Sequence, residues 1–251
     1  MSLFQGAIYK IAASIFIFFA AKCSAAKLNL NEQVLFLAGL PKPPFIINDK
    51  GEGLQIDIIR EALSAQNIMV EFQHMPLSRT ILGFQQLNAD AISIVPSNYS
   101  YQGMYISKPY ITYQNVAVSL AERELTIDSI YDLDGLIIAA FQRAGKHLGD
   151  EYNLNVASSS QYREIAEQRE QVDMLFRGEA EVIILDLNIF IYFCKIHKNT
   201  MYQNPFKIHY IFDEKQYSAG FKSEELKDKF DKGVAEIKSN GQYNYILNKY
   251  L

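Results

Sequence analysis

The pattern of apolar and polar positions predicts short strands that alternate with amphipathic helices. Apolar, β-rich runs of four or five residues recur along the first half of the chain, and most are followed by a stretch with helical spacing. The expected strands there are 34–38, 69–72, 91–95 and 116–120, and the expected helices are 53–65 and 78–88. Such alternation is typical of βα units with largely parallel sheets, which predicts an α/β fold.

The helix expected at 53–65 carries an apolar stripe on one face, with Leu54, Ile58 and Ala62 at helical spacing. This spacing indicates a helix that packs against a sheet. The helix expected at 78–88 follows a proline, and its first residue, Ser78, is a suitable N-cap.

The second half repeats this organisation from Asp128 onward. Its expected elements are a strand at 136–141, a helix at about 162–177 and a buried strand at 182–185, and the set closes near Tyr210. A last amphipathic helix is expected to begin after its cap Ser223 and to end at Gly241, which suits a left-handed C-terminal position. A short Tyr-rich helix through Tyr250 is expected at the end of the chain.

The N-terminal segment has the pattern of a secretory signal. Lys10 precedes an apolar run at 11–21, and the small residues at 24–26 follow it. The apolar run has about half of the roughly 20 residues that a membrane anchor needs. A lipid anchor at Cys23 is disfavoured because Lys22 directly precedes it. We therefore expect residues 1–26 to be a cleaved signal peptide and the mature chain to be periplasmic.

Composition narrows the possible partners. The 251-residue chain has a formal charge of −4, and loss of residues 1–26 removes two lysines and no acid, which makes it −6. A mildly acidic chain argues against nucleic acid as a partner. Only Cys194 remains after processing, so we expect it to be buried and unpaired. The four histidines show no metal-ligand spacing, and Cys194 with His197 is an incomplete set, so neither metal nor cofactor is expected.

Several short motifs, in order and spacing, resemble the family-3 extracellular solute-binding proteins, which include amino-acid receptors of ABC importers. Each motif alone is weak, but together they cover nearly all of the mature chain. They are Pro43-Pro44-Phe45, 53–58, 88–91, Ile106-Ser107-Lys108-Pro109-Tyr110, 127–135, 176–181 leading to Asp186, 217–221 and 237–242.

The resemblance implies a two-lobed periplasmic binding protein-like fold of type II, with two strands that cross between the lobes near 113–116 and 210–216. Lobe 1 would comprise 27–114 plus 212–251, and lobe 2 would comprise 115–211. It also implies a monomer that holds a small-molecule ligand between the lobes and presents it to an inner-membrane permease or receptor. A ligand that satisfies polar groups on both lobes favours the closed form.

Three candidate ligand-binding residues come from lobe 1. Phe45 follows two prolines and could form a pocket wall or pack in the core. Arg79 lies in the first turn of its helix, where the helix dipole disfavours a cation, so it could be held there for an anionic ligand or could pair with a surface carboxylate. Tyr110 belongs to a Tyr-rich segment that could line the cleft, although some of these rings must pack inside the lobe.

Two further candidates come from lobe 2. Arg143 and the turn at 144–146 follow a strand, and exposed backbone N–H groups there could cradle an anion. Asp186 ends the buried strand at 182–185, at a sheet edge of the kind that lines ligand crevices. The resemblance implies that this aspartate binds the α-amino group of an amino acid, and the alternative is that it caps the following segment.

One position departs from the family pattern. The amino-acid receptors have an arginine before the Ser-x-Pro-Tyr element, where it binds the ligand carboxylate, but Ser100 occupies that position here. Either Arg79 supplies the cation, or the ligand lacks a carboxylate at that place. The solute can therefore be amino-acid-like, an amine or an organic acid.

Two other functions fit the same scaffold. Some proteins that resemble this family are dehydratases, in which a pocket carboxylate acts as a general acid, and Asp57, Asp90 and Asp186 are candidates for that role. Others are sensory domains that present the ligand to a membrane receptor. Because no pair of carboxylates can be inferred from the spacing, we expect a binding protein and not an enzyme.

Overall fold

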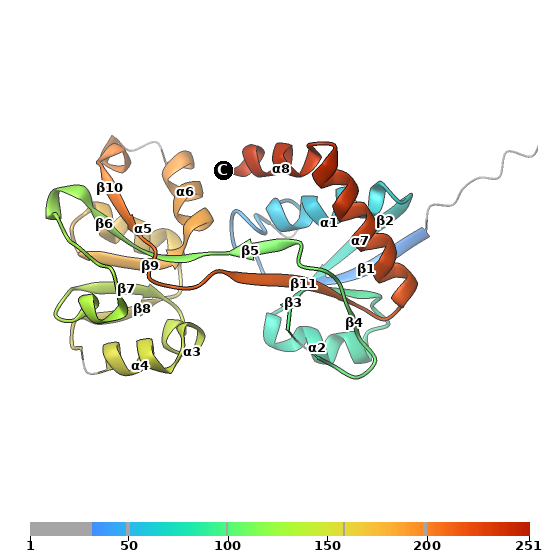
Figure 1. Ribbon diagram of the computed structural model, residues 1–251, viewed down its shortest axis with the longest axis horizontal. Helices are drawn as coiled ribbons and strands as arrows, with labels where there is room; N and C mark the ends of the chain where they lie inside the picture. Colours follow the sequence, from blue (N-terminus) through green and yellow to red (C-terminus); the bar gives the residue numbers. More distant parts are fainter. Residues whose placement is uncertain (1–31, 49–50, 99, 158, 198–199) are drawn as a thin grey trace, which may run out of the picture. The chain divides into compact units, whose positions relative to one another are not determined.

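The strands of the protein form two separate sheets (Figure 1). The structure is a computed structural model, and it describes residues 32–48, 51–98, 100–157, 159–197 and 200–251. The signal peptide expected at 1–26 lies outside the described residues. The two sheets and the helices packed on them confirm the predicted α/β fold.

The first sheet has the strand order β2-β1-β3-β11-β4, and β5 also pairs with β11. Strands β1, β2 and β3 run parallel, whereas β11 is antiparallel to β3. This is the arrangement that the βα alternation predicts. The strands are β1 (Glu32–Ala38), β2 (Ile68–His74), β3 (Ala91–Pro96), β4 (Tyr105–Ile106), β5 (Ile111–Tyr113) and β11 (Lys215–Phe221).

Helices cover both faces of this sheet. Adjacent residues of a strand point to opposite faces, and on β1 the ring of Phe36 packs in one core cluster while Leu37 packs in another with Phe84 of α2. Figure 1 accordingly shows α2 on the opposite side of the sheet from α1 and α7. The helices are α1 (Leu54–Ser64), α2 (Leu77–Gln86), α7 (Glu224–Ser239) and α8 (Gln242–Tyr250).

The second sheet has the order β10-β6-β9-β7-β8. Its central strand β9 is buried along its whole length, which explains the apolar run at 182–185. The strands are β6 (Asn115–Leu120), β7 (Ile138–Phe141), β8 (Tyr162–Ile165), β9 (Val182–Asp186) and β10 (Phe206–His209). The helices are α3 (Ala144–Leu148), α4 (Asp150–Ala157), α5 (Gln168–Phe176) and α6 (Leu187–Ile196). Within the described residues, no helix is both long and apolar enough to cross a membrane.

The chain passes between the sheets twice. Strand β5 leads directly into β6, and the segment after β10 leads into β11, as the green and orange stretches of Figure 1 show. These passages confirm the two predicted crossing strands. The exact lobe boundaries, at 114/115 and 211/212, stay a prediction, because strand pairing defines the sheets and not the lobes.

Two local expectations need correction, and three helices were missed. Helix α2 begins at Leu77, directly after the extended Pro76, so Ser78 lies inside the first turn and does not cap it. The helix expected at 162–177 is a strand, β8, followed by α5, because the first four residues pair in parallel with β7. Helices α3, α4 and α6 were not predicted. In α6 the residues are apolar nearly all round, which conceals the helical period.

The two ends of α7 follow the prediction. The Leu226 N–H donates to the hydroxyl of Ser223 over 3.3 Å, which caps the helix. Gly241 has a φ of 84°, the left-handed conformation that glycine favours after a helix.

Candidate functional site

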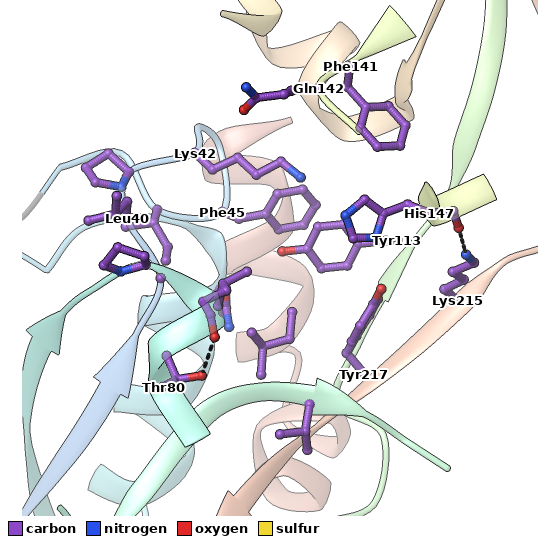
Figure 2. A pocket seen from close by; sticks show the side chains of 18 of the residues that line it. Leu40, Lys42, Phe45, Thr80, Tyr113, Phe141, Gln142, His147, Lys215 and Tyr217 are labelled. Atoms are coloured by element: carbon purple, nitrogen blue, oxygen red, sulfur yellow. Dashed lines mark hydrogen bonds between the residues drawn. The ribbon is translucent and has the colours of Figure 1, made fainter. Parts of the chain in front are cut away.

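A pocket of about 680 Å³ is lined by residues from both sheets. The first sheet and its loops contribute the 39–46 turn, the first turns of α2 and side chains of β11, and the second contributes side chains of β6, β7, α3 and α5. Figure 2 shows lysine, aromatic and amide side chains pointing into this space. The volume is typical of a small-molecule site.

Phe45 is among the residues that line this pocket, but its side chain is 0% exposed and also packs in the main core cluster, so the structure supports both of the roles considered for it. The turn that carries it is closed by two backbone hydrogen bonds between Lys42 and Ile46, of 2.7 and 3.1 Å. The Phe45 ring stacks on Tyr113 of β5, with ring centroids 4.0 Å apart and planes inclined by 20°. The turn and the end of β5 thus place two stacked rings at this side of the pocket (Figure 2).

Tyr110 lies behind the pocket and is not among the residues that line it. It is 1% exposed, and its hydroxyl donates to the Ser93 carbonyl oxygen over 2.5 Å and accepts from the Gln55 amide over 3.0 Å. Burial raises the pKa of Tyr110 well above its ordinary value, so the hydroxyl remains a donor. Since Gln55 itself lines the pocket, Tyr110 acts as a residue that positions Gln55.

Asp186 is the N-cap of α6, which was the alternative interpretation of this residue. One carboxylate oxygen accepts from the N–H groups of Asn188 and Ile189, at 3.0 and 3.3 Å, and the other accepts from the N–H of Gln114, at 3.0 Å. The residue is 2% exposed and is not among the residues that line the pocket. Burial raises its pKa to about 6, although the Lys42 ammonium and the three N–H donors oppose this shift.

Lys42 brings a cation into the pocket beside this buried acid. Its ammonium lies 5.4 Å from the centroid of the Tyr113 ring, and Figure 2 shows the side chain reaching over Phe45. Lys42 remains accessible to water through the pocket, yet enough protein surrounds the ammonium for burial to lower its pKa, and the Asp186 carboxylate opposes that shift.

The anion cradle predicted at Arg143 exists, but the protein fills it with its own carboxylate. Arg143 has a left-handed φ of 65°, and its N–H donates to Glu164 over 2.6 Å. The Gly145 N–H and the Tyr162 hydroxyl also donate to Glu164, over 3.2 and 3.0 Å. Burial would raise the pKa of Glu164, but these donors outweigh it and lower the pKa. The Arg143 side chain is exposed and does not line the pocket.

Arg79 is also exposed and lies outside the pocket lining. It occupies the third position of α2, and the next residue, Thr80, is the one that faces the pocket. Ser100 is exposed and is not a lining residue either. Arg79 therefore does not replace the carboxylate-binding arginine that the family has at the position of Ser100.

Of the five predicted ligand-binding residues, only Phe45 is in the lining, and the polar and aromatic lining residues that were not predicted include Lys42, Gln55, Lys215 and Tyr217. Lys42 directly precedes the Pro-Pro-Phe motif and Gln55 lies inside the next motif, so both adjoin recognisable landmarks. Lys215 and Tyr217 lie at the second crossing, where β11 begins. Polar residues at the predicted crossing strands could therefore have been predicted as candidates for the pocket.

Lys215 connects β11 to the second sheet. Its ammonium donates a hydrogen bond to the backbone carbonyl oxygen of His147 on α3, drawn in Figure 2. The His147 ring lines the same pocket. Burial lowers the pKa of His147, and the positive charges of Lys215, Lys42, Lys146 and Arg143 lower it further.

The buried Asp186 predicts a pH-dependent stability. Its pKa is about 6 in the folded protein against 3.8 when free, so between these values the folded state holds a proton that the unfolded chain has lost. The stabilising effect is complete below about pH 4 and disappears as the pH rises through 6, a change of about 3 kcal/mol. Urea unfolding from pH 4 to 7 gives the free energy of unfolding of the Asp186→Asn variant and of the unsubstituted protein. The difference between these two free energies at each pH measures the contribution of Asp186.

Because other carboxylates affect both proteins equally, only this difference is informative. We expect the Asn variant to gain stability relative to the unsubstituted protein as the pH rises from 4 to 6. A difference that stays constant over that range would contradict the raised pKa of Asp186.

One buried polar contact lies apart from the pocket. The Ser119 hydroxyl contacts His209 Nε2 at 2.9 Å, but both residues are at least 96% buried and neither lines the pocket. Among the described residues, no group of three or more His, Cys, Asp or Glu side chains is placed to hold a metal ion.

Solved structures with the same fold include binding and sensor proteins. The L-cystine solute receptor of Neisseria gonorrhoeae, unliganded and open, is 17% identical, with a TM-score of 0.64 and coverage of 88% of this chain and 94% of that chain. An ancestral amino acid-binding protein, described as a precursor of cyclohexadienyl dehydratase, is 16% identical, with a TM-score of 0.63 and coverage of 87% and 94%. A histidine kinase sensor domain is 16% identical, with a TM-score of 0.63 and coverage of 88% and 97%.

These low identities establish the fold alone. No curated protein matches the sequence. The model of the bacterial extracellular solute-binding proteins, family 3, matches residues 37–251, which is most of the chain, and the protein belongs to that family.

Proposed function

We propose that the protein is a periplasmic solute-binding protein that captures a small polar solute between its two lobes and delivers it to an inner-membrane ABC importer. The observation that carries this proposal is the pocket, because both sheets line it. A solute that contacts both sides stabilises the closed arrangement, and a membrane partner can recognise that arrangement.

The pocket lining supports binding of a polar solute. Gln55, Asn115, Gln142 and Gln168 bring amide groups to it, and Lys42 brings a positive charge. Aliphatic side chains and aromatic rings form the rest of the wall (Figure 2). A few polar groups on an apolar lining are characteristic of small-molecule sites. The amino acid and cystine named for two similar structures are solutes of suitable size.

Periplasmic location is supported by the N-terminal sequence and by the family. The apolar run at 11–21 follows Lys10 and precedes small residues, as in a secretory signal. The family is named for extracellular proteins. We infer that export removes residues 1–26 and leaves a monomer in the periplasm.

The residues that line the pocket favour binding of a solute over catalysis. None of the described residues that line the pocket is an aspartate or a glutamate. Asp57 is bound by Arg60, Lys249 and Tyr250, and Asp186 caps α6. A dehydratase reaction that needs a pocket carboxylate as general acid therefore has less support.

A sensory role is the second candidate, and the similarity to a histidine kinase sensor domain favours it. The two roles share the same solute site and differ in the membrane partner. Permease and ATPase genes beside the gene for this protein would support import, and a kinase or cyclase gene would support sensing.

A thermal-shift screen of the purified protein tests the proposed function. The panel comprises amino acids, polyamines, organic acids and small sugars. A solute at a hundredfold excess over its dissociation constant should add about 2.7 kcal/mol to the stability, which is readily visible as a higher melting temperature. Recovery of that solute unchanged after incubation supports binding, and its conversion to a product would support the enzymatic alternative. The absence of any shift would contradict the proposed function.

A further inference from the structure

We propose that the solute is a small organic acid with a flat apolar body and without an amino group, held by the ammonium groups of Lys42 and Lys215 between aromatic rings. This inference rests on the proposed solute-binding function and names the chemical class of the ligand. The charges, the position of the acid and the rings each support one part of it.

The charged side chains that line the pocket are cationic. Lys42 and Lys215 are the lysines among its described lining residues, and no described acid is among them. The charges of Lys215 and Lys42 both act on His147, whose ring lines the same pocket. An anionic group entering this space gains charge-assisted hydrogen bonds, and a cationic one meets like charges.

The acid that could have received an amino group is not available to the solute. Asp186 is 2% exposed, and its two oxygens already accept three backbone N–H groups. The cation that acts on its carboxylate is Lys42, which approaches from the pocket. Lys42 thus already supplies the positive charge that the amino group of a ligand would otherwise bring to Asp186.

The rings define the body of the solute. Tyr113 stacks on Phe45 and meets Tyr217 edge to face, with centroids 5.1 Å apart. On the second sheet, the rings of Phe141 and His147 lie 6.3 Å apart. In Figure 2 the end of the Lys42 side chain lies between the rings of Phe45 and Phe141. Aromatic walls on both sides favour a flat apolar body, because rings prefer stacked or edge-to-face contacts.

Matched sets of compounds test the inference on the unsubstituted protein. Each set contains a carboxylic acid, its amide, its α-amino acid and the corresponding amine: for example phenylacetate, phenylacetamide, L-phenylglycine and benzylamine. The panel extends over aromatic and aliphatic acids of two to nine carbons, and calorimetry measures each dissociation constant. We expect at least one acid to bind, with its amide and its α-amino analogue at least tenfold weaker and its amine without measurable binding.

The outcomes separate this inference from the proposed function. If an α-amino acid or an amine binds more tightly than the matched acid, the protein binds solutes but the inference is wrong. If no compound of any class in this panel or in the thermal-shift screen binds, the proposed function itself is contradicted.

A second test uses variants of the lysines. Lys42→Met and Lys215→Met keep most of the side-chain length and remove the charge, and each should weaken the best acid ten- to hundredfold, as expected for loss of a charged hydrogen bond. Lys146→Met is the matched control, because Lys146 is exposed, lies next to His147 and does not line the pocket. Its affinity should change less than threefold.

Lys42→Met also has a readout that a structural role would not affect. Without Lys42, no described lysine neutralises the Asp186 carboxylate. The amino group of an α-amino acid can then supply that positive charge, so the preference of the protein for the acid over its α-amino analogue should become smaller. Circular dichroism establishes that the variant is folded. Unchanged affinity for the acid in both lysine variants would overturn the inference, as would equal losses in Lys42→Met and Lys146→Met.

Discussion

Replacing Gly233 with alanine is expected to lower the free energy of unfolding by about 2–4 kcal/mol. Gly233 is buried on α7 against α1, and a Cβ atom there would lie 1.9 Å from the Ala62 carbonyl oxygen and 2.6 Å from its carbon. These are backbone atoms, which cannot rotate away as a side chain can, so α7 must move away from α1. Alanine otherwise favours a helix by about 1 kcal/mol over glycine, which makes a net loss informative. Urea unfolding followed by circular dichroism measures it.

Gly83→Ala is the matched control. Gly83 is buried in α2, but its added Cβ would lie 3.0 Å from Met75 Sδ and 3.1 Å from a Leu37 methyl carbon, both at the ends of flexible side chains. We expect its stability to change by less than about 1 kcal/mol, since higher helix propensity offsets the crowding. A Gly233→Ala variant as stable as this control would contradict the close packing of α1 on α7.

Gly53→Ala is expected to cost about 3 kcal/mol and to weaken solute binding. Gly53 precedes α1 with a φ of 134°, and an added Cβ would lie 2.4 Å from the carbonyl oxygen of Phe45 and 2.8 Å from the Cα of Ile46. The substitution therefore displaces the turn that holds the Phe45 ring against Tyr113. Urea unfolding gives the loss of stability, and calorimetry with the best solute of the screen gives the loss of affinity.

Gly103→Ala is the matched control, because it introduces backbone strain without displacing the Phe45 turn. Gly103 also has a positive φ, of 80°, but no atom lies within 4 Å of its added Cβ. It should cost about 1 kcal/mol, the strain of a left-handed residue, and should leave solute affinity unchanged. If Gly53→Ala lost no more stability than Gly103→Ala and kept full affinity, the contact between Gly53 and the Phe45 turn would not position the pocket wall.

Hydrophobic periodicity predicted the elements that pack one face on a sheet. In α1 the predicted stripe of Leu54, Ile58 and Ala62 is fully buried, because an amphipathic surface helix shows its period directly. Hydrophobic periodicity did not predict α6, which is apolar nearly all round. It also did not predict β8, whose four residues become a strand only by pairing with β7. Strand pairing between distant segments is a tertiary effect that a local pattern does not contain.

The site was harder to predict than the fold. For Phe45 the sequence left a pocket wall and core packing open, and in the structure the residue both lines the pocket and packs in the core. Asp186 and Arg143 were chosen for chemistry that the structure uses internally, the first in a helix cap and the second in a backbone cradle filled by Glu164. Sequence alone identifies groups that can bind an ion, but whether the protein itself satisfies them depends on three-dimensional neighbours.

The lysines of the pocket illustrate the same limit. Lysine is common on protein surfaces, so neither Lys42 nor Lys215 stands out by residue type. Their role depends on the turn that projects Lys42 over Phe45 and on the crossing that brings Lys215 to His147. Both are consequences of how the two sheets are connected.

Hydrogen–deuterium exchange with and without the best solute of the screen tests most directly whether the solute is held between the two sheets. Amide exchange reports local opening residue by residue, and a ligand slows it where it makes contact. The account predicts slower exchange in both the 42–47 turn and the 141–147 segment when the solute is bound. Protection confined to one of these segments, or found only outside both, would contradict it.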